Sequence, residues 1–310
     1  MTTQPSLRSD LEDYLRLRRA LGFKLKSAGR LLGQFVDYLQ ARGVDVITTD
    51  DALAWASLPA ASPHWRAIRL SAVRGFAAYL HGIDASVVVP PAGLVRSGSC
   101  RATPYLYSAA EIVSLLNATG ELRPPLRAAT YYSVIGLLAV SGMRIGEAIA
   151  LDDGDLDVER NLLVVRDSKF GKSRLVPVHS TTTATVVRYQ QLRDELRPRR
   201  SSPALFVSSV GTRLLHSNIS LTFAGLTERS GIARRSASCR PRVHDLRHAF
   251  AVTSLLECYE SGGDVPAMLP RLATYLGHTD PKHTFWYLSA APELMVLAGR
   301  RLDMHLEGRP

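Results

Sequence analysis

Four short segments of the chain concentrate cationic and imidazole side chains that could act on an anionic oxygen. They are Ser141–Glu147, Ser168–Lys172, His244–His248 and Leu276–His278, and Tyr287 follows nine residues after the last histidine. A guanidinium fork binds phosphate through paired hydrogen bonds, and all but five of the 38 basic residues are arginines. The segments therefore predict an anion site, although codon bias would explain the arginine excess equally well.

Two arginines in these segments are placed to reach a common anion. Arg144 follows an apolar helix and a Ser-Gly break, which can deliver its guanidinium to a cleft. The alternative is a surface arginine paired with Glu147 one helical turn later. His244 and Arg247 are three residues apart, so on a helix they share one face and can reach the same oxygen atom.

The remaining candidates are lysines in a turn and an aromatic hydroxyl. Lys169 and Lys172 lie in the turn of a predicted β-hairpin, where a flexible ammonium can reach a leaving oxygen. Ordinary solvated turn lysines are the alternative. Tyr287 follows Phe285 and Trp286 on a helix that Asp280 and Pro281 would cap, so a buried core tyrosine is the alternative to a reactive one.

Neither a metal nor a nucleotide site is indicated. His244 and His248 lack a third ligand and an HExxH pattern, and Asp152–Asp157 lacks the spacing and terminal Glu of a calcium loop. Gly171–Ser173 resembles the end of a phosphate loop, but the glycine required five positions earlier is Arg166. The acidic stretch therefore predicts a polar turn, and the chain is expected to need no metal and no cofactor.

Composition places the chain among globular proteins with a polyanionic partner. Its 310 residues predict two domains, and 38 basic against 28 acidic residues give a formal charge of +10. Three cysteines are too few for a disulfide framework. The longest apolar run, Ala128–Val140, is too short to span a bilayer, and the N-terminus has no signal-peptide core. We therefore expect a cytoplasmic protein with no membrane contact.

The first part of the chain predicts a small helical bundle over residues 1–86. Apolar residues recur at spacings of three and four in 25–39 and in 65–80, and Ser62-Pro63 predicts an N-cap with proline in the first helical position. Basic side chains on the last helix are either a solvated face or a surface for the polyanion.

A second domain is expected over residues 105–310, after an interdomain linker at 87–104 that is rich in proline, glycine and serine. Ser108 and Glu111 form a capping box ahead of helices. Two β-branched runs then predict a hairpin within 155–178, Leu205–Val207 predicts a further short strand, and helical periodicity returns after Ser217. The fold class predicted is mainly α with a small β-sheet.

Taken together, the segments resemble one family, the tyrosine recombinases, also called phage integrases. The resemblance covers residues 105–290, and the bundle before them is similar to the core-DNA-binding (SAM-like) domain. The matching elements, in the order of the family, are the Arg in SGMRIGE, a hairpin Lys before VPV, HDLRHAFA, LGH and a Tyr nine residues later. The chain resembles the two-domain Xer-like or transposon-borne type, and this resemblance implies that both domains clamp double-stranded DNA.

The resemblance implies a DNA strand transferase that forms a 3′-phosphotyrosine and needs no cofactor. Two guanidiniums would stabilise the charge on the phosphate oxygens, and a histidine would hydrogen-bond the same phosphate. A second histidine would take the tyrosine proton, and a lysine would protonate the leaving 5′-oxygen. The residues in these roles are, in order, Arg144 and Arg247, His278, His244, Lys169, and Tyr287 as nucleophile. Lys172 is the alternative acid, and Glu147 matches the residue that supports the first arginine.

Further expectations concern DNA contacts and assembly. Seven arginines are candidates for DNA binding: Arg66, Arg69, Arg74, Arg234, Arg235, Arg240 and Arg242. For Arg234–Arg242, a solvated loop is the alternative. The segment Glu257–Pro270 predicts an inserted loop. By analogy with relatives, the helix after Tyr287 implies a homotetramer on two paired sites, with intramolecular packing as the alternative.

The resemblance leaves three functions open. The first is a site-specific recombinase, integrase or transposase of a bacterial, nucleoid-associated kind, acting alone or with partner recombinases. The second is a topoisomerase IB-like nicking and closing enzyme, which uses the same chemistry without paired sites. The third is a catalytically silent DNA-binding protein, against which the complete set of six catalytic positions argues.

Overall fold

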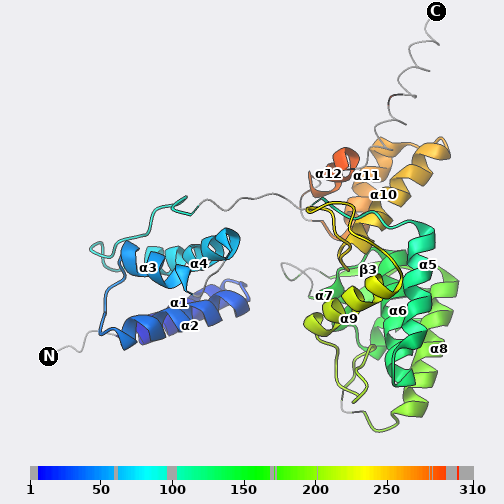
Figure 1. The fold of residues 1–310 in the computed structure, drawn as a ribbon, viewed down its shortest axis with the longest axis horizontal. Helices are drawn as coiled ribbons and strands as arrows, with labels where there is room; N and C mark the ends of the chain where they lie inside the picture. The colour runs from blue at the N-terminus through cyan, green and yellow to red at the C-terminus, as the bar shows by residue number, and fades with distance from the viewer. Residues whose placement is uncertain are drawn as a thin grey trace, which may run out of the picture. The chain divides into compact units, whose positions relative to one another are not determined.

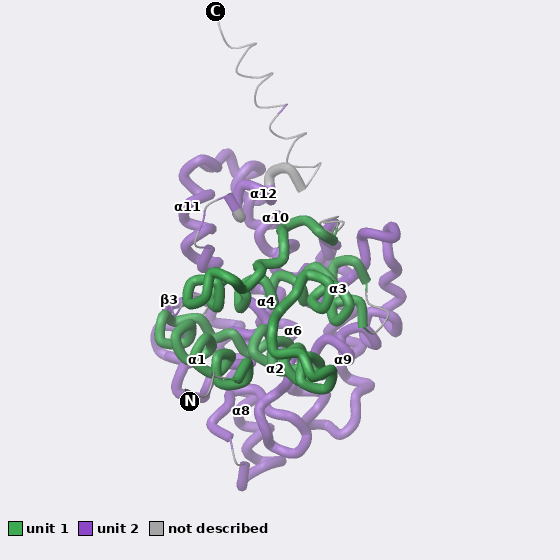
Figure 2. Tube along the Cα trace, turned by 90° about the vertical axis from the view of Figure 1, so that its left-hand side faces the viewer, with its two compact units in different colours: residues 1–101 green, residues 102–310 purple. Residues whose placement is uncertain are grey.

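The computed structural model divides into two compact units, residues 1–101 and 102–310 (Figure 2). The change of unit lies within the stretch of sequence expected to be a linker. Helices predominate in both units, with one small sheet among the residues described, so the predicted fold class is confirmed. The structure describes residues 6–58, 62–95, 103–167, 171, 173–200, 202–278, 280, 282–290 and 299.

The first unit is a four-helix bundle (Figure 1). Its helices are α1 (Leu7–Ala20), α2 (Lys26–Ala41), α3 (Thr49–Ser57) and α4 (Pro63–His81). The predicted start of the last helix is confirmed, because the Ser62 hydroxyl accepts a hydrogen bond from the Trp65 backbone N–H and Pro63 occupies the first turn. Phe35 and Phe76 are fully buried at the centre of the bundle.

Helix α6 is the axis of the second unit and packs against α5, α8 and α10 (Figure 1). The helices here are α5 (Ala109–Ala118), α6 (Pro125–Ser141), α7 (Ile145–Ala150), α8 (Ser180–Leu196), α9 (His216–Arg229), α10 (Asp245–Glu260), α11 (Val265–Leu276) and α12 (Lys282–Ala290), with 3-10 turns η1 (Thr119–Glu121) and η2 (Asp153–Asp155). The predicted capping box of α5 is present: Ser108 N–H donates to the Glu111 carboxylate at 2.7 Å, and Glu111 N–H donates back to Ser108 Oγ at 3.2 Å. No helix among the described residues is both long and apolar enough to cross a membrane.

The hairpin is confirmed and belongs to a three-stranded antiparallel sheet. Strands β1 (Leu156–Asp157), β2 (Leu162–Val165) and β3 (Arg174–Pro177) lie in that order. Val165 pairs with Arg174, the last pair before the turn that contains the two lysines. The strand predicted at Leu205–Val207 does not form, because the chain there makes only isolated bridges, including one between Val207 and Arg213.

The acidic stretch after α7 is a polar turn, as predicted, and its carboxylates hold neighbouring segments together. Asp152 N–H bonds to the Asp155 carboxylate at 2.9 Å, which closes the 3-10 turn that leads into β1. The ion pairs are Asp152 with Arg213, Asp153 with Arg193 and Arg200, and Asp155 with Arg166. Arg193 is 1% exposed, so the guanidinium that pairs with Asp153 lies in the core of the unit.

The prediction of an inserted loop at Glu257–Pro270 is wrong. Helix α10 continues to Glu260, a turn at Ser261–Gly263 follows, and α11 begins at Val265 with the Asp264 carboxylate capping the Ala267 N–H at 3.0 Å. Glycines and prolines in this segment suggested a loop, but they mark a tight turn and the start of a helix. The apolar residues that bury α11 recur at helical spacing: Val265, Leu269, Leu272 and Leu276.

Candidate active site

A sharp turn after α6 aims Arg144 into the second unit. Gly142 ends the helix in the left-handed region, at φ +58°, and a Cβ atom there would lie 2.5 Å from the Phe250 ring. The chain then reverses into α7, with Arg144 as its N-cap. The backbone N–H of Arg144 donates to Glu147 Oε2 at 3.0 Å, and its side chain, 26% exposed, pairs with the same carboxylate, as the alternative prediction had it.

Glu147 lies between two arginines, and only one of them was expected from the sequence. Arg144 Nη1 donates to Oε1 at 2.7 Å, while Arg174 donates from Nη1 to Oε1 at 3.0 Å and from Nη2 to Oε2 at 2.8 Å. Burial alone would raise the pKa of the Glu147 carboxyl, but the hydrogen bonds and charge of Arg174, and then those of Arg144, lower it to about 2. Glu147 is therefore ionised at neutral pH and bridges both guanidiniums.

The C-terminal end of α11 binds three arginines through three successive backbone carbonyls, which we term the carbonyl edge. Gly277 terminates the helix at φ +70° and leaves these carbonyls without helical partners. A helix C-terminus carries partial negative charge, so it offsets the repulsion between the clustered guanidiniums. The bonds are Arg174 Nε to Tyr275 O at 2.9 Å, Arg247 Nη2 to Leu276 O at 2.7 Å, and Arg144 Nη2 to Gly277 O at 2.9 Å.

Arg247 is the most deeply placed of the three arginines. It lies in the first turn of α10 and is 2% exposed, and its Nη1 also donates to Gly142 O at 2.7 Å. Burial and the nearby charge of Arg144 lower the pKa of Arg247 to about 10, so the guanidinium still carries its charge at neutral pH. This side chain therefore joins the C-terminal ends of α6 and α11.

Tyr287 is brought beside these groups by α12, which packs against α10 and α11 of the same chain. It is 2% exposed, and its ring centroid lies 6.1 Å from that of His278 and 5.4 Å from that of His248. His278 Nδ1 is 2.7 Å from Thr284 Oγ1, which fixes the orientation of the imidazole. The nucleophile candidate thus lies beside His278, which the sequence predicted, and beside His248, which it did not assign to the chemistry.

His244 extends this group to the N-terminal end of α10, four residues before His248. It is the N-cap residue of the helix and is exposed, and its ring centroid lies 5.0 Å from that of His248. The pKa of His244 is lowered, first because surrounding protein atoms remove part of its hydration and then by the charge of Arg247. A neutral imidazole at physiological pH can accept a proton.

Comparison with known proteins identifies the family of the chain. Residues 107–293 match the Phage integrase family, and this match spans more than half of the chain. The chain belongs to the phage integrase family. Its members, the tyrosine recombinases, are site-specific DNA strand transferases, and the chain is an enzyme of this class.

Individual relatives within the phage integrase family cover nearly the whole chain. Protein y4rB of Sinorhizobium fredii (strain NBRC 101917 / NGR234), named as an integrase/recombinase, is 44% identical over 98% of this chain and 99% of its own. Tyrosine recombinase XerC of Actinobacillus pleuropneumoniae serotype 7 is 28% identical over 87% of this chain and 79% of its own. A lambda integrase tetramer bound to a Holliday junction shares the fold, with a TM-score of 0.59 and 18% identity over 92% of this chain and 78% of that one.

Two of the residues expected to act in this family's chemistry lie outside the described residues. They are Lys169 and Lys172, in the turn between β2 and β3. The apolar and basic residues after α12 that implied a tetramer also lie outside the described residues: Leu294, Met295, Leu297, Arg300, Arg301, Leu302 and Met304. The described residues that flank the lysine turn, Asp167 and Arg174, show where the turn leaves and rejoins the sheet.

The first unit presents less free charge than the sequence suggested for a DNA-binding domain. Arg69 is 6% exposed, and its guanidinium lies 3.8 Å from the centroid of the Trp55 ring. It is a core residue of the bundle, which corrects the expectation that it faces DNA. Arg74 donates to the carbonyls of Pro90 and Pro91, at 2.9 Å each, while Arg66 is half-buried.

The basic segment before α10 contains four arginines, three of which are exposed. Arg242 forms a bidentate pair with Asp245 at 3.0 and 2.8 Å, and Asp245 is fully buried. Arg235 lies 4.4 Å from the centroid of the Tyr105 ring and donates to the Leu106 carbonyl at 2.9 Å. Arg234, Arg235 and Arg240 are the exposed ones, and they remain candidates for DNA contact.

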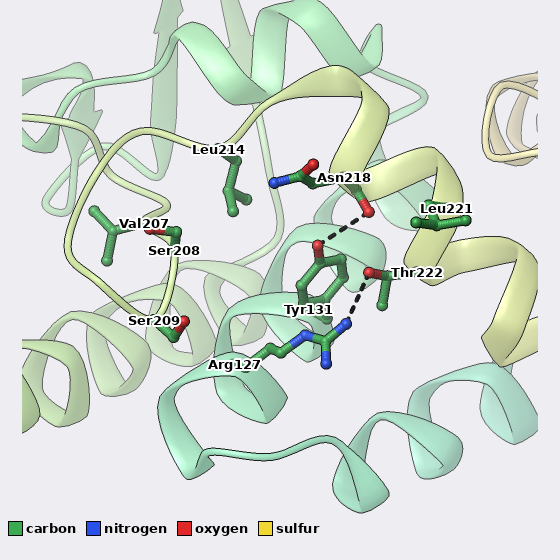
Figure 3. A pocket seen from close by; sticks show the side chains of 9 residues that line it. All are labelled: Arg127, Tyr131, Val207, Ser208, Ser209, Leu214, Asn218, Leu221 and Thr222. Atoms are coloured by element: carbon green, nitrogen blue, oxygen red, sulfur yellow. Dashed lines mark hydrogen bonds between the residues drawn. The ribbon is translucent and has the colours of Figure 1, made fainter.

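A cavity of about 270 Å³ in the second unit is separate from these groups (Figure 3). It lies between the first half of α6, the segment 207–214 and α9, and none of the candidate catalytic residues lines it. Arg127 donates to Thr222 Oγ1 at 3.1 Å, and the Tyr131 hydroxyl donates to Asn218 O at 3.2 Å. Elsewhere in the described part of the chain, no three His, Cys, Asp or Glu side chains cluster in a way that could hold a metal ion.

The low pKa of Glu147 predicts an acid-sensitive fold. A carboxyl lowered from 4.5 to about 2 contributes about 3 kcal/mol of stability above its unfolded pKa, and this contribution is lost as the pH falls from 4.5 towards 2. Glu147→Gln is expected to be less stable at pH 7 and to lose that part of the acid dependence. Urea unfolding at pH 7 and pH 3 measures both.

The matched control for this prediction is Glu228→Gln, on the exposed side of α9. It should show the same change in stability between pH 7 and pH 3 as the wild type. An unchanged pH dependence in Glu147→Gln would contradict the assignment of the bridge.

Proposed function

We propose that this protein cleaves and rejoins DNA strands at specific sites through a 3′-phosphotyrosine formed on Tyr287. The observation that carries the proposal is the meeting of Arg144, Arg247, His278 and Tyr287 around the carbonyl edge of α11. These groups come from four segments of the chain, and each supplies a type of group that phosphoryl transfer through a tyrosine requires.

The two arginines bind the non-bridging oxygens of the scissile phosphate in this mechanism. Each guanidinium has five N–H donors, and the protein contacts of Arg247 use two of them. The remaining donors are available to the extra negative charge that develops in the pentavalent transition state. Because Arg247 and Tyr287 are each 2% exposed, DNA must displace the protein atoms that cover them before the reaction.

Proton transfer is divided between histidine and lysine. His244, whose lowered pKa keeps it neutral, accepts the phenol proton as Tyr287 attacks phosphorus. His278 hydrogen-bonds the same phosphate. Lys169 protonates the leaving 5′-oxygen, with Lys172 as the alternative acid. The phosphotyrosine conserves the energy of the phosphodiester, so the second strand can rejoin without a nucleotide triphosphate.

Assembly on double-stranded DNA completes the proposed function. The formal charge of +10 and the exposed Arg234 and Arg240 support binding to a polyanion, and the proposal is that both units contact the duplex. Likeness in fold to the lambda integrase tetramer on a Holliday junction supports an assembly of four copies. In the proposal these copies act on two paired sites, and the segment after α12 joins them. Partner recombinases would take the place of some copies.

A nicked suicide substrate tests this function. DNA from the flanks of the native element is incubated with the protein, and the products are resolved on a denaturing protein gel. A covalent adduct is expected with the wild type. DNA binding without an adduct would favour a silent DNA-binding protein, and relaxation of a plasmid that lacks paired sites would favour a topoisomerase IB-like enzyme.

A further inference from the structure

Arg174 has the contacts of a residue that organises the active site, although neither the motifs nor the proposed chemistry gives it a role. It is the first residue of β3, and its side chain is 13% exposed. We propose that Arg174 is a positioning residue for strand transfer, which orients Arg144 through Glu147 and fastens the lysine-bearing hairpin to the carbonyl edge. This inference rests on the proposed function.

The described contacts of Arg174 are all made with other parts of the protein. Three of its nitrogens donate to the two Glu147 oxygens and to Tyr275 O, at 2.8 to 3.0 Å. Its guanidinium also lies against the backbone of Gly277, where a Cβ atom would be 2.7 Å from Nη1. A side chain bonded to Glu147 and to the carbonyl edge acts through these neighbours. Arg174 is therefore a positioning residue and not a catalytic one.

The first effect of Arg174 is on the orientation of Arg144. A bidentate pair fixes both the place and the plane of the Glu147 carboxylate. That carboxylate then accepts from the backbone N–H of Arg144 and from its Nη1. Without Arg174, the buried carboxylate can turn about its last side-chain bond, and Arg144 loses a fixed acceptor. The guanidinium would then reach the phosphate in several orientations.

The second effect is on the hairpin that contains Lys169. Arg174 is paired with Val165 at the mouth of the lysine turn and donates to Tyr275 O at 2.9 Å. At the other end of β3, the Tyr275 hydroxyl donates to Pro177 O at 3.1 Å. One residue of α11 therefore holds both ends of the strand. The base of the lysine turn is fixed relative to the same helix end that binds Arg144 and Arg247.

The chain offers a matched control for a merely structural ion pair. Arg166 follows β2 directly and forms an ion pair at 2.8 Å with Asp155, whose side chain is 6% exposed. The Arg166 side chain is 63% exposed, and this ion pair includes neither Glu147 nor a carbonyl of the carbonyl edge. Arg166→Gln is expected to cleave DNA at the wild-type rate.

The test separates cleavage from binding and from folding. Single-turnover cleavage of the nicked substrate at saturating DNA, the Kd for the same DNA and the Tm are measured for the wild type, Arg174→Lys, Arg174→Gln, Glu147→Gln and the Arg174→Gln/Glu147→Gln double variant. Arg174→Gln should slow cleavage about 10- to 100-fold, the scale on which loss of orientation acts. The Kd should change less than about threefold. The double variant should be no slower than the worse single one, because both act through one contact.

Several outcomes would overturn the inference. They are cleavage by Arg174→Gln within about twofold of the wild type, parallel losses of binding and cleavage, and multiplication of the two single effects in the double variant. Arg174→Lys keeps the charge, and if Arg174→Gln does not fold, cleavage by the lysine variant at the wild-type rate overturns the inference as well. Absence of an adduct with the wild type overturns the proposed function together with it, whereas a wild-type adduct with unaffected Arg174 variants overturns this inference alone.

Discussion

Tyr287→Phe is expected to abolish the covalent protein–DNA adduct and to leave folding and DNA binding unchanged. The substitution removes only the hydroxyl oxygen, which is the atom that bonds to phosphorus in the proposed step. The ring keeps its place among His248, Trp286 and His278, with centroids 5.4 to 6.1 Å away. Loss of a hydroxyl contact costs about 1 kcal/mol, which is small beside the loss of the nucleophile.

The control for this result is Tyr132→Phe. Tyr132 is 44% exposed on α6, in the same unit and away from the carbonyl edge. It should form adduct at the wild-type rate in the same denaturing gel. An adduct that persists in Tyr287→Phe would mean that another side chain attacks the phosphate, and the assignment of the nucleophile would fall.

Local signals in the sequence account for what could be predicted of the fold. Ser62-Pro63, the Ser108–Glu111 capping box and the β-branched runs around the lysine turn each act within a few residues, and each produced the expected element. The Ser-Gly break before Arg144 is also local, since only the left-handed conformation of Gly142 at φ +58° lets the chain turn there. Such features depend on neighbours in the chain and are visible without the fold.

The grouping of the arginines could not be predicted in the same way. Arg174 reads as an ordinary strand residue before a VPV run, and its partner Glu147 lies 27 residues away. The other acceptor, Tyr275 O, is a backbone atom 101 residues away. Backbone carbonyls at a helix end have no signature in residue type, so the carbonyl edge emerges only when α11 is placed. The one signal in the sequence was the additional arginine near VPV, which could have suggested a bidentate partner for Glu147.

The wrong predictions for Glu257–Pro270 and Arg69 share a physical cause. In both, packing outweighed a local tendency of the sequence. Glycines and prolines in Glu257–Pro270 favoured a loop, yet burial of the apolar face of α11 maintains a helix through Pro270. Arg69 was counted as surface charge, but stacking on Trp55 places it in the core of the bundle. Composition alone does not separate an arginine that faces solvent from one that covers an aromatic ring.

Arg247→Lys is expected to cause the second large loss, about 100- to 1,000-fold in cleavage rate, since removal of one donor to a developing oxyanion costs that much. Charge is retained, but an ammonium cannot span the acceptors Gly142 O and Leu276 O and still donate to a phosphate. Stability should fall too, because a buried carbonyl left without a donor costs about 1–3 kcal/mol. Single-turnover cleavage and Tm measure the two effects separately.

The control is Arg160→Lys, whose side chain is 78% exposed in its pair with Asp157 and which should match the wild type in both measurements. Cleavage by Arg247→Lys is compared well below its own Tm, so that unfolding does not enter the rate. A folded Arg247→Lys protein that cleaves within about tenfold of the wild type would show that charge alone suffices at this position. A larger loss would mean that the fork geometry is required, because one side chain must join the ends of α6 and α11 and still bind the phosphate.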